Sequence, residues 1–154
     1  MNNINCLVCD RIELIKKNEN KYFVKELESG YVVLADVQYF LGYTIFLSKI
    51  HTDELHKLGN KNRETFLKEM AIVAQAVYNT FVPVKLNYEL LGNTDRHLHW
   101  HIIPRYGTDP RPETAIWAID NAVRHDERFK PNDNQLNEMK TKLLQELDNL
   151  INSQ

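Results

Sequence analysis

The segment His97–Ile103, which reads His-Leu-His-Trp-His-Ile-Ile, constrains the fold of this chain more than any other stretch. Polar and apolar residues alternate along it, and on a β-strand side chains two residues apart point to the same face. The segment therefore predicts a strand with three imidazoles on one face. We expect Leu98, Trp100 and Ile102 to point the other way, into a core beneath a helix.

The spacing of the three histidines limits what they do together. Neighbouring imidazoles start from backbone positions about 6.6 Å apart, and the outer two start about 13 Å apart. One metal ion with bonds of about 2.0–2.1 Å to His could bind two neighbours but not both ends, so at least one imidazole is left for other work. A single strand histidine is usually an ordinary surface residue. Three in strict alternation favour nucleophilic attack or proton transfer near neutral pH.

The rest of the chain predicts four more strands and two long helices. Phe66, Met70, Val73, Val77 and Phe81 recur three or four residues apart, which is typical of an amphipathic helix. Strands in two groups around a long helix indicate an α+β domain with an antiparallel sheet. The expected strands are 22–28, 31–37, 43–49, 84–91 and 97–104, and the expected helices are 61–81 and 134–151, the second capped by Asn132 or Asp133.

Length and composition narrow the class of protein. A chain of 154 residues with 43% hydrophobic content predicts one domain over 1–154. Its net charge is −2 and neither sign forms a long block, so we expect no nucleic-acid partner and only local binding of any phosphate. Two cysteines make no disulfide scaffold, and no stretch is typical of a signal peptide or a membrane span. These features favour a cytoplasmic location.

The histidine strand resembles the His-x-His-x-His-x-x motif of the histidine triad superfamily of nucleotide hydrolases and transferases. The resemblance extends to Leu91-Gly92-Asn93 before the strand and Pro104-Arg105-Tyr106 after it. Within the superfamily, the chain is similar to a bacterial branch with a His-Leu-His-Trp-His motif and resembles diadenosine polyphosphate hydrolase-like proteins. It implies a HIT-like α+β fold with an antiparallel sheet of about five strands, a long helix and a C-terminal helical extension, usually in a homodimer.

The resemblance assigns the chemistry of the triad. It implies that His99 attacks the α-phosphorus of a nucleotide, that His101 hydrogen-bonds the phosphate or leaving group, and that Thr94 contacts phosphate. Asn93 and Asn87 could donate further hydrogen bonds to the substrate. A neutral imidazole is a competent nucleophile near pH 7, so the chemistry is sound on the residues themselves.

Three more residues are candidates for substrate binding. The resemblance implies that Asp36 accepts hydrogen bonds from ribose hydroxyls, although a solvated Asp at a strand end is equally consistent with the sequence. Tyr43 stands where many family members carry a fourth histidine, and it can donate a hydrogen bond without sharing charge. Arg105 could reach a polyphosphate tail, or it could be an ordinary surface or dimer-contact residue.

Cys6 and Cys9 form a C-x-x-C pair, which suits half of a zinc site, a redox pair or no site at all. Redox chemistry prefers such a pair at a helix start after a strand, whereas this pair precedes the first expected strand. Some histidine triad relatives complete a zinc site with a histidine after the third strand and the first of the triad, here His51 and His97. The resemblance therefore implies a structural Cys₂His₂ zinc site, and no organic cofactor is expected.

The sequence thus predicts a nucleotide hydrolase acting at the α-phosphate of dinucleoside polyphosphates or nucleoside phosphoramidates. The alternatives are a nucleotidyltransferase and a zinc-stabilised nucleotide-binding module with little catalysis. A small-molecule nucleotide and a second copy of the chain are the expected partners. His56 and His125 are interpreted as surface residues, and Trp117 as a core residue.

Overall fold

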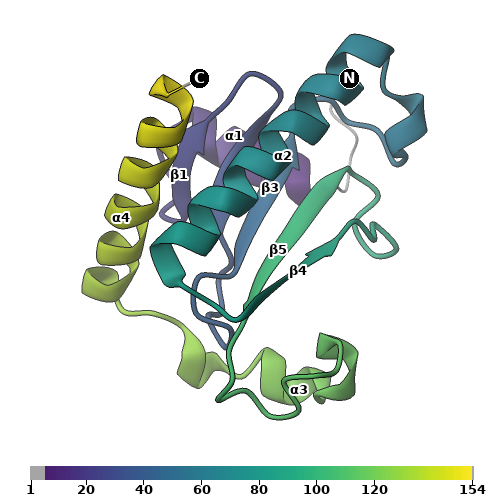
Figure 1. The fold of residues 1–154 in the computed structure, drawn as a ribbon. Helices are drawn as coiled ribbons and strands as arrows, with labels where there is room; N and C mark the ends of the chain where they lie inside the picture. The colour runs from purple at the N-terminus through teal and green to yellow at the C-terminus, as the bar shows by residue number, and fades with distance from the viewer. Residues whose placement is uncertain (1–5, 154) are drawn as a thin grey trace.

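The computed structural model describes residues 6–153 and has an α+β fold built on a five-stranded sheet (Figure 1). The strands lie in the order β1-β2-β3-β5-β4, and every neighbouring pair is antiparallel. The expected meander of the first three strands is confirmed, and β5 joins the two strand groups by pairing with β3. The strands span Phe23–Glu26 (β1), Gly30–Leu34 (β2), Thr44–Ser48 (β3), Lys85–Glu89 (β4) and His99–Arg105 (β5).

Two long helices cover one face of the sheet, and a shorter helix covers the other (Figure 1). α2 packs on β3 and β5, and α4 packs on α2 and β1. No helix within residues 6–153 is both long and apolar enough to cross a membrane. The helices span Leu7–Lys16 (α1), Asn60–Phe81 (α2), Asn121–Arg124 (α3) and Asp133–Asn152 (α4), with 3-10 turns at Leu55–Lys57, Ile116–Ala118 and Glu127–Phe129.

The main core lies between the sheet and the two long helices. Val73 and Val77 of α2 and Leu143 of α4 are fully buried there against Phe46 and Ile102 of the central strands. The apolar positions recur three or four residues apart on the helices and two apart on the strands, so each element turns one apolar face to this layer. This layer fixes the sheet from which the histidines project.

The C-terminal end of α2 and the N-terminal end of α4 lie at residues that stop or cap helices. α2 stops before Pro83, with Val82 in the left-handed conformation at a φ of 51°. α4 starts with a capping box, in which Asn132 accepts from the backbone of Gln135 and the Gln135 side chain accepts from the backbone of Asn132.

The register of β5 decides which way the histidines face. His99 lies opposite Leu47 of β3, and His101 lies opposite Ile45, so each pair shares a face of the sheet. Leu47 belongs to the apolar cluster beneath α1, which places both imidazoles on the α1 side. Ile102 faces α2 as the alternation predicts.

Two local expectations differ from the structure. β5 begins at His99 and not at residue 97, because His97 lies in the connection before the strand with its N–H bonded to the Asp95 carbonyl. In addition, α1 was not expected from the sequence. Cys6 caps this helix, and its buried residues Ile12 and Ile15 pack on the histidine face of the sheet.

Candidate active site and metal centre

His99 is held by the residue two positions before it. Its Nδ1 atom lies 2.6 Å from the backbone carbonyl oxygen of His97. A carbonyl oxygen only accepts hydrogen bonds, so Nδ1 carries the proton and Nε2 keeps its lone pair. The side chain is buried in the sheet but lines a cavity. The imidazole of His99 is therefore oriented so that Nε2 is the nitrogen available as a nucleophile.

His101 is held by Tyr43, whose hydroxyl lies 2.6 Å from His101 Nδ1. Within residues 6–153, His101 Nδ1 is the only hydrogen-bond partner of the Tyr43 hydroxyl. The O–H therefore donates to Nδ1, which leaves the ring proton of His101 on Nε2. Burial raises the pKa of Tyr43 well above its usual value, which keeps the phenol protonated. Burial, with a smaller contribution from His99, lowers the pKa of His101 to about 4. His101 is thus a neutral hydrogen-bond donor at pH 7.

The two imidazoles open onto a cavity of about 470 Å³. This volume lies within the range of about 300–1,000 Å³ that small-molecule sites occupy. The cavity lies between α1, the ends of β2, β3 and β5, and the chain after β5. Its polar lining comprises Arg11, Asp36, Tyr43, Asp95, His99, His101, Arg124, His125, Glu127 and Lys130.

Asp36, the residue expected to bind ribose, lines the cavity, and its carboxylate already has a partner. Arg11 of α1 donates two hydrogen bonds to it, at 2.6 and 2.7 Å. Both side chains are about one-third exposed, so a ligand could reach the same carboxylate from the cavity. The sequence did not identify Arg11, because the helix that carries it was not expected.

Asn93 and Thr94 are exposed in the connection between β4 and β5, and neither lines the cavity. Their neighbour Asp95 does line it. The connection that carries Asn93 and Thr94 therefore borders the cavity.

Arg105 is not where a polyphosphate could reach it, which corrects the expectation for this residue. Its side chain is 1% exposed and donates to Asp109, to Asn87 Oδ1 and to the carbonyl of Thr114. The guanidinium also lies 5.1 Å from the ring of Phe40. Asn87 is likewise engaged with Arg105 and does not line the cavity, so both residues brace the chain that follows β5.

Two residues to which the sequence assigned no function remain. His125 is exposed, as expected, and it also lines the cavity. Trp117, expected in the core, is 55% exposed, and its ring lies 5.2 Å from Arg124. Neither position has a local signal in the sequence, because residues 116–130 form short turns and one short helix without a repeating pattern.

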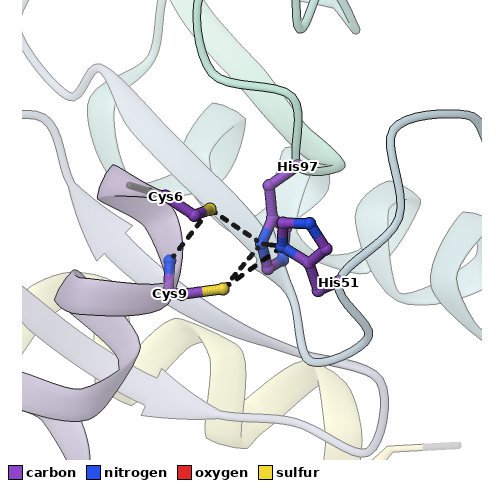
Figure 2. Close-up of side chains that lie close together, drawn as sticks. All are labelled: Cys6, Cys9, His51 and His97. Carbon is purple, nitrogen blue, oxygen red and sulfur yellow. Dashed lines mark hydrogen bonds between the residues drawn. The ribbon is translucent and has the colours of Figure 1, made fainter. Parts of the chain in front are cut away.

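Cys6, Cys9, His51 and His97 converge beside the cavity, as Figure 2 shows. The Sγ–Nδ1 distances are 3.5 Å from Cys6 to His97, 3.4 Å from Cys9 to His97 and 3.3 Å from Cys9 to His51, and the two Nδ1 atoms are 3.1 Å apart. A tetrahedral zinc site with ordinary bond lengths has ligand atoms about 3.3 to 3.8 Å apart. The four side chains are therefore compatible with zinc.

The tautomer of His97 fits the same interpretation. Its Nε2 donates to the carbonyl oxygen of Ser48 at 2.8 Å, so its Nδ1 lone pair faces the two sulfur atoms. Burial, with a further contribution from Cys6, raises the pKa of Cys9 to about 11. The pair lies at a helix start, where redox pairs also occur, but the two histidine nitrogens that converge on the sulfur atoms favour metal binding.

Comparison with known proteins agrees with this geometry. The sequence pattern of the HIT domain matches residues 16–108. The chain is 27% identical over 136 residues to "Protein hit" of Bacillus subtilis (strain 168), covering 85% of this chain and 88% of that one.

Two solved structures show the same fold. One is a Zn-bound histidine triad family protein from Mycobacterium smegmatis, with a TM-score of 0.69, 18% identity and coverage of 98% and 99% of the two chains. The other is the diadenosine triphosphate hydrolase of Plasmodium falciparum, with a TM-score of 0.62, 13% identity and coverage of 84% and 78%. Because the HIT domain match covers more than half of its length, this chain belongs to the histidine triad family.

Proposed function

We propose that this chain is a nucleotide hydrolase that cleaves at the α-phosphate of dinucleoside polyphosphates or nucleoside phosphoramidates. Membership of the HIT family supports a nucleotide-binding or hydrolase-type activity in general, and one relative in fold is named a diadenosine triphosphate hydrolase. The observation that carries the proposal is the bond from His99 Nδ1 to the His97 carbonyl, because it leaves Nε2 as the nucleophile at the cavity.

The proposed reaction has two steps. In the first, the Nε2 lone pair of His99 forms a bond to the α-phosphorus, and the bond from phosphorus to the leaving group breaks with its electron pair. The carbonyl of His97 accepts from Nδ1–H and offsets the positive charge that develops on the ring. In the second, water attacks the phosphorus of the nucleotidyl-histidine, the electron pair of the N–P bond returns to Nε2, and the proton lost by the attacking water goes to solvent. Splitting one displacement into two lowers each barrier.

The remaining cavity residues would bind the substrate. We propose that Nε2–H of His101 donates to a phosphate oxygen, with Tyr43 holding the ring in place. Asp36 would accept from the ribose hydroxyls, with Arg11 orienting its carboxylate. Thr94 and Asn93 would contact phosphate from the connection that borders the cavity.

A substrate panel tests this function. Wild-type protein is expected to release nucleoside monophosphate from a dinucleoside polyphosphate or a phosphoramidate, and His99→Ala is expected to lose turnover by a factor of at least about 10³ while keeping its fold. His56→Ala is the matched control, because His56 is exposed in the 3-10 turn before α2 and does not line the cavity. Equal turnover by wild type and His99→Ala would contradict the proposal. Transfer to an added alcohol in preference to water would favour a transferase, and saturable binding without product would favour a binding module.

We further propose that Cys6, Cys9, His51 and His97 hold one structural zinc ion. Four protein ligands close the site to water, so the ion would fix α1 to the sheet and would take no part in the chemistry. A zinc-bound relative in fold supports this assignment. Metal analysis of protein purified without added zinc is expected to find about one zinc per chain, and protein without bound metal would overturn it.

Two further parts of the proposal concern the state of the protein in the cell. We propose a homodimer through the edge strand β4, in which Tyr88 is 48% exposed and which follows Val84, 69% exposed. We also propose a cytoplasmic location, because two cysteines make no disulfide scaffold and both belong to the proposed zinc site. Light scattering on the full chain tests the dimer, and a monomer at micromolar concentration would exclude it.

A further inference from the structure

Residues 116–130, which we call the wall segment, form one side of the cavity and lie outside the HIT domain match at 16–108. Figure 1 shows α3, which belongs to this segment, beyond the end of β5. Ile116 is buried against Phe40. The carbonyl of Phe129 accepts from the backbone N–H of residue 38 at 2.9 Å. The wall segment is therefore packed in place beside the catalytic strand.

Arg124 is the residue of the wall segment that lacks a charged partner. Its Nε donates to the carbonyl of Ile119 at 3.0 Å, and the guanidinium lies 5.2 Å from the ring of Trp117. No carboxylate within residues 6–153 lies within ion-pair distance of it. The backbone bond and the ring fix the side chain while both terminal NH₂ groups stay available, which suits recognition of a phosphate.

The other lysine and arginine side chains of the cavity are engaged. Arg11 donates to both oxygens of Asp36, and Lys130 lies 2.6 Å from Glu127. Arg124 is therefore the cavity cation whose charge is not already matched by a carboxylate at contact distance.

The charge of Arg124 acts at the His101 end of the cavity. Burial raises the pKa of Tyr43, and the positive charge of Arg124 opposes that shift. The same pair of effects acts on Glu89, which lies opposite His101 in the register of β4 and β5. Arg124 and His101 line the same cavity, and Tyr43, whose pKa the charge of Arg124 lowers, hydrogen-bonds His101.

We propose that Arg124 binds the phosphates of the leaving group, and that the wall segment thereby selects nucleoside polyphosphates over phosphoramidates. This inference rests on the proposed hydrolase function and names its preferred substrate class. It also gives a role to a part of the chain that lies beyond the HIT domain match.

The chemistry of the two leaving groups explains the selection. With a polyphosphate, the bond from His99 Nε2 to the α-phosphorus forms, the bond from that phosphorus to the bridging oxygen breaks, and the electron pair leaves on the polyphosphate as added negative charge. Arg124 offsets that charge. With a phosphoramidate, an amine leaves with the electron pair, takes a proton from water and bears no negative charge. A nearby cation therefore assists the first reaction and not the second.

Kinetics of the full chain on two substrates tests the proposal. The substrates are diadenosine tetraphosphate and adenosine 5′-phosphoramidate, and the variants are Arg124→Gln, Arg124→Lys and the control Arg128→Gln. Arg128 lies four residues further on, pairs with Asp126 and does not line the cavity. Calorimetric titration with inorganic tripolyphosphate measures phosphate binding without turnover, and circular dichroism checks the fold of each variant.

Arg124→Gln is expected to lower kcat/KM for the tetraphosphate about ten- to hundredfold more than for the phosphoramidate, and to weaken tripolyphosphate binding similarly. Arg124→Lys restores part of the loss, because it keeps the charge but not the planar fork. Arg128→Gln behaves as wild type. Equal losses on both substrates, or unchanged tripolyphosphate binding, would overturn the assignment. If wild type hydrolyses neither substrate while Arg124→Gln still weakens tripolyphosphate binding, the hydrolase function fails and the phosphate site stands.

Discussion

His97 and His99 are linked through a single carbonyl group: the main-chain oxygen of His97 accepts from Nδ1 of His99 at 2.6 Å, while the ring of His97 faces Cys6 and Cys9. One residue therefore contributes a ring nitrogen to the metal cluster and sets the tautomer of the proposed nucleophile. This relationship joins the proposed zinc site to the proposed active site. α1 also joins them, because it carries both Cys9 and Arg11.

Loss of the metal cluster should therefore affect the cavity as well as the stability. Cys9→Ser is expected to lower the free energy of unfolding by about 3 kcal/mol, which is about 10 °C in Tm for a chain of this length. It should also weaken the binding of a nucleotide to the folded protein, because Arg11 and its contact with Asp36 depend on the position of α1. Thermal unfolding and calorimetric titration with AMP measure the two effects. A variant with unchanged Tm and unchanged affinity would contradict the link.

Removal of the Tyr43 hydroxyl should impair catalysis more than folding. Tyr43→Phe leaves His101 Nδ1 without its donor, so the ring is free to turn and its Nε2–H is no longer aimed at the substrate. We expect kcat to fall about tenfold, the loss of one hydrogen bond to a catalytic group. Tyr78→Phe is the matched control, since Tyr78 is exposed on α2. Equal rates for Tyr43→Phe and wild type would remove the role of this hydroxyl.

The depressed pKa of His101 predicts a pH dependence of stability. Its folded-state pKa of about 4 lies below its ordinary value of 6.5, so between these values the unfolded chain binds more protons. Stability should rise with pH through this window, by an amount on the order of 3 kcal/mol for this group. Denaturant unfolding at a series of pH values measures the slope. His101→Gln should show a smaller slope by up to about 1.4 kcal/mol per pH unit, and an unchanged slope would exclude His101 as its source.

Two adjacent leucines on α4 test the packing of the main core. Leu143 is fully buried, whereas Leu144 is 36% exposed. Leu143→Ala is expected to cost about 2–5 kcal/mol of unfolding free energy, because it leaves a cavity between α4 and the sheet. Leu144→Ala should change stability far less. Chemical denaturation measures the free energy of unfolding of both variants. Similar decreases would mean that α4 turns a different face to the core.

Local patterns were sufficient for most of the sheet and both long helices. The period-two alternation of residues 97–103 predicts the faces of β5, and the three-or-four spacing in 61–81 predicts α2, because each pattern is set by the element's own geometry. α1 was missed although Val8, Ile12 and Ile15 carry helical spacing. A helix of ten residues is marginal without its tertiary contacts, so three apolar positions are a weak signal on their own.

The wall segment could not have been predicted by the same means. Arg124 and His125 line the cavity because Ile116 and Ile119, earlier in the same segment, pack beside β5. No periodic pattern in the sequence encodes that packing. Arg105 illustrates the converse case. Its position directly after the triad suggested the substrate, but the residues that bury it, such as Asp109, come together only in the folded chain.

Trapping of the covalent intermediate tests the central claim most directly. Wild-type protein is mixed with diadenosine tetraphosphate, quenched within milliseconds under conditions that preserve phosphorus–nitrogen bonds, and analysed intact and as peptides by mass spectrometry. The account predicts a nucleotidyl adduct on the peptide that contains His99, present in wild type and in His56→Ala and absent from His99→Ala. Product formation with no adduct, or an adduct that persists in His99→Ala, would contradict it.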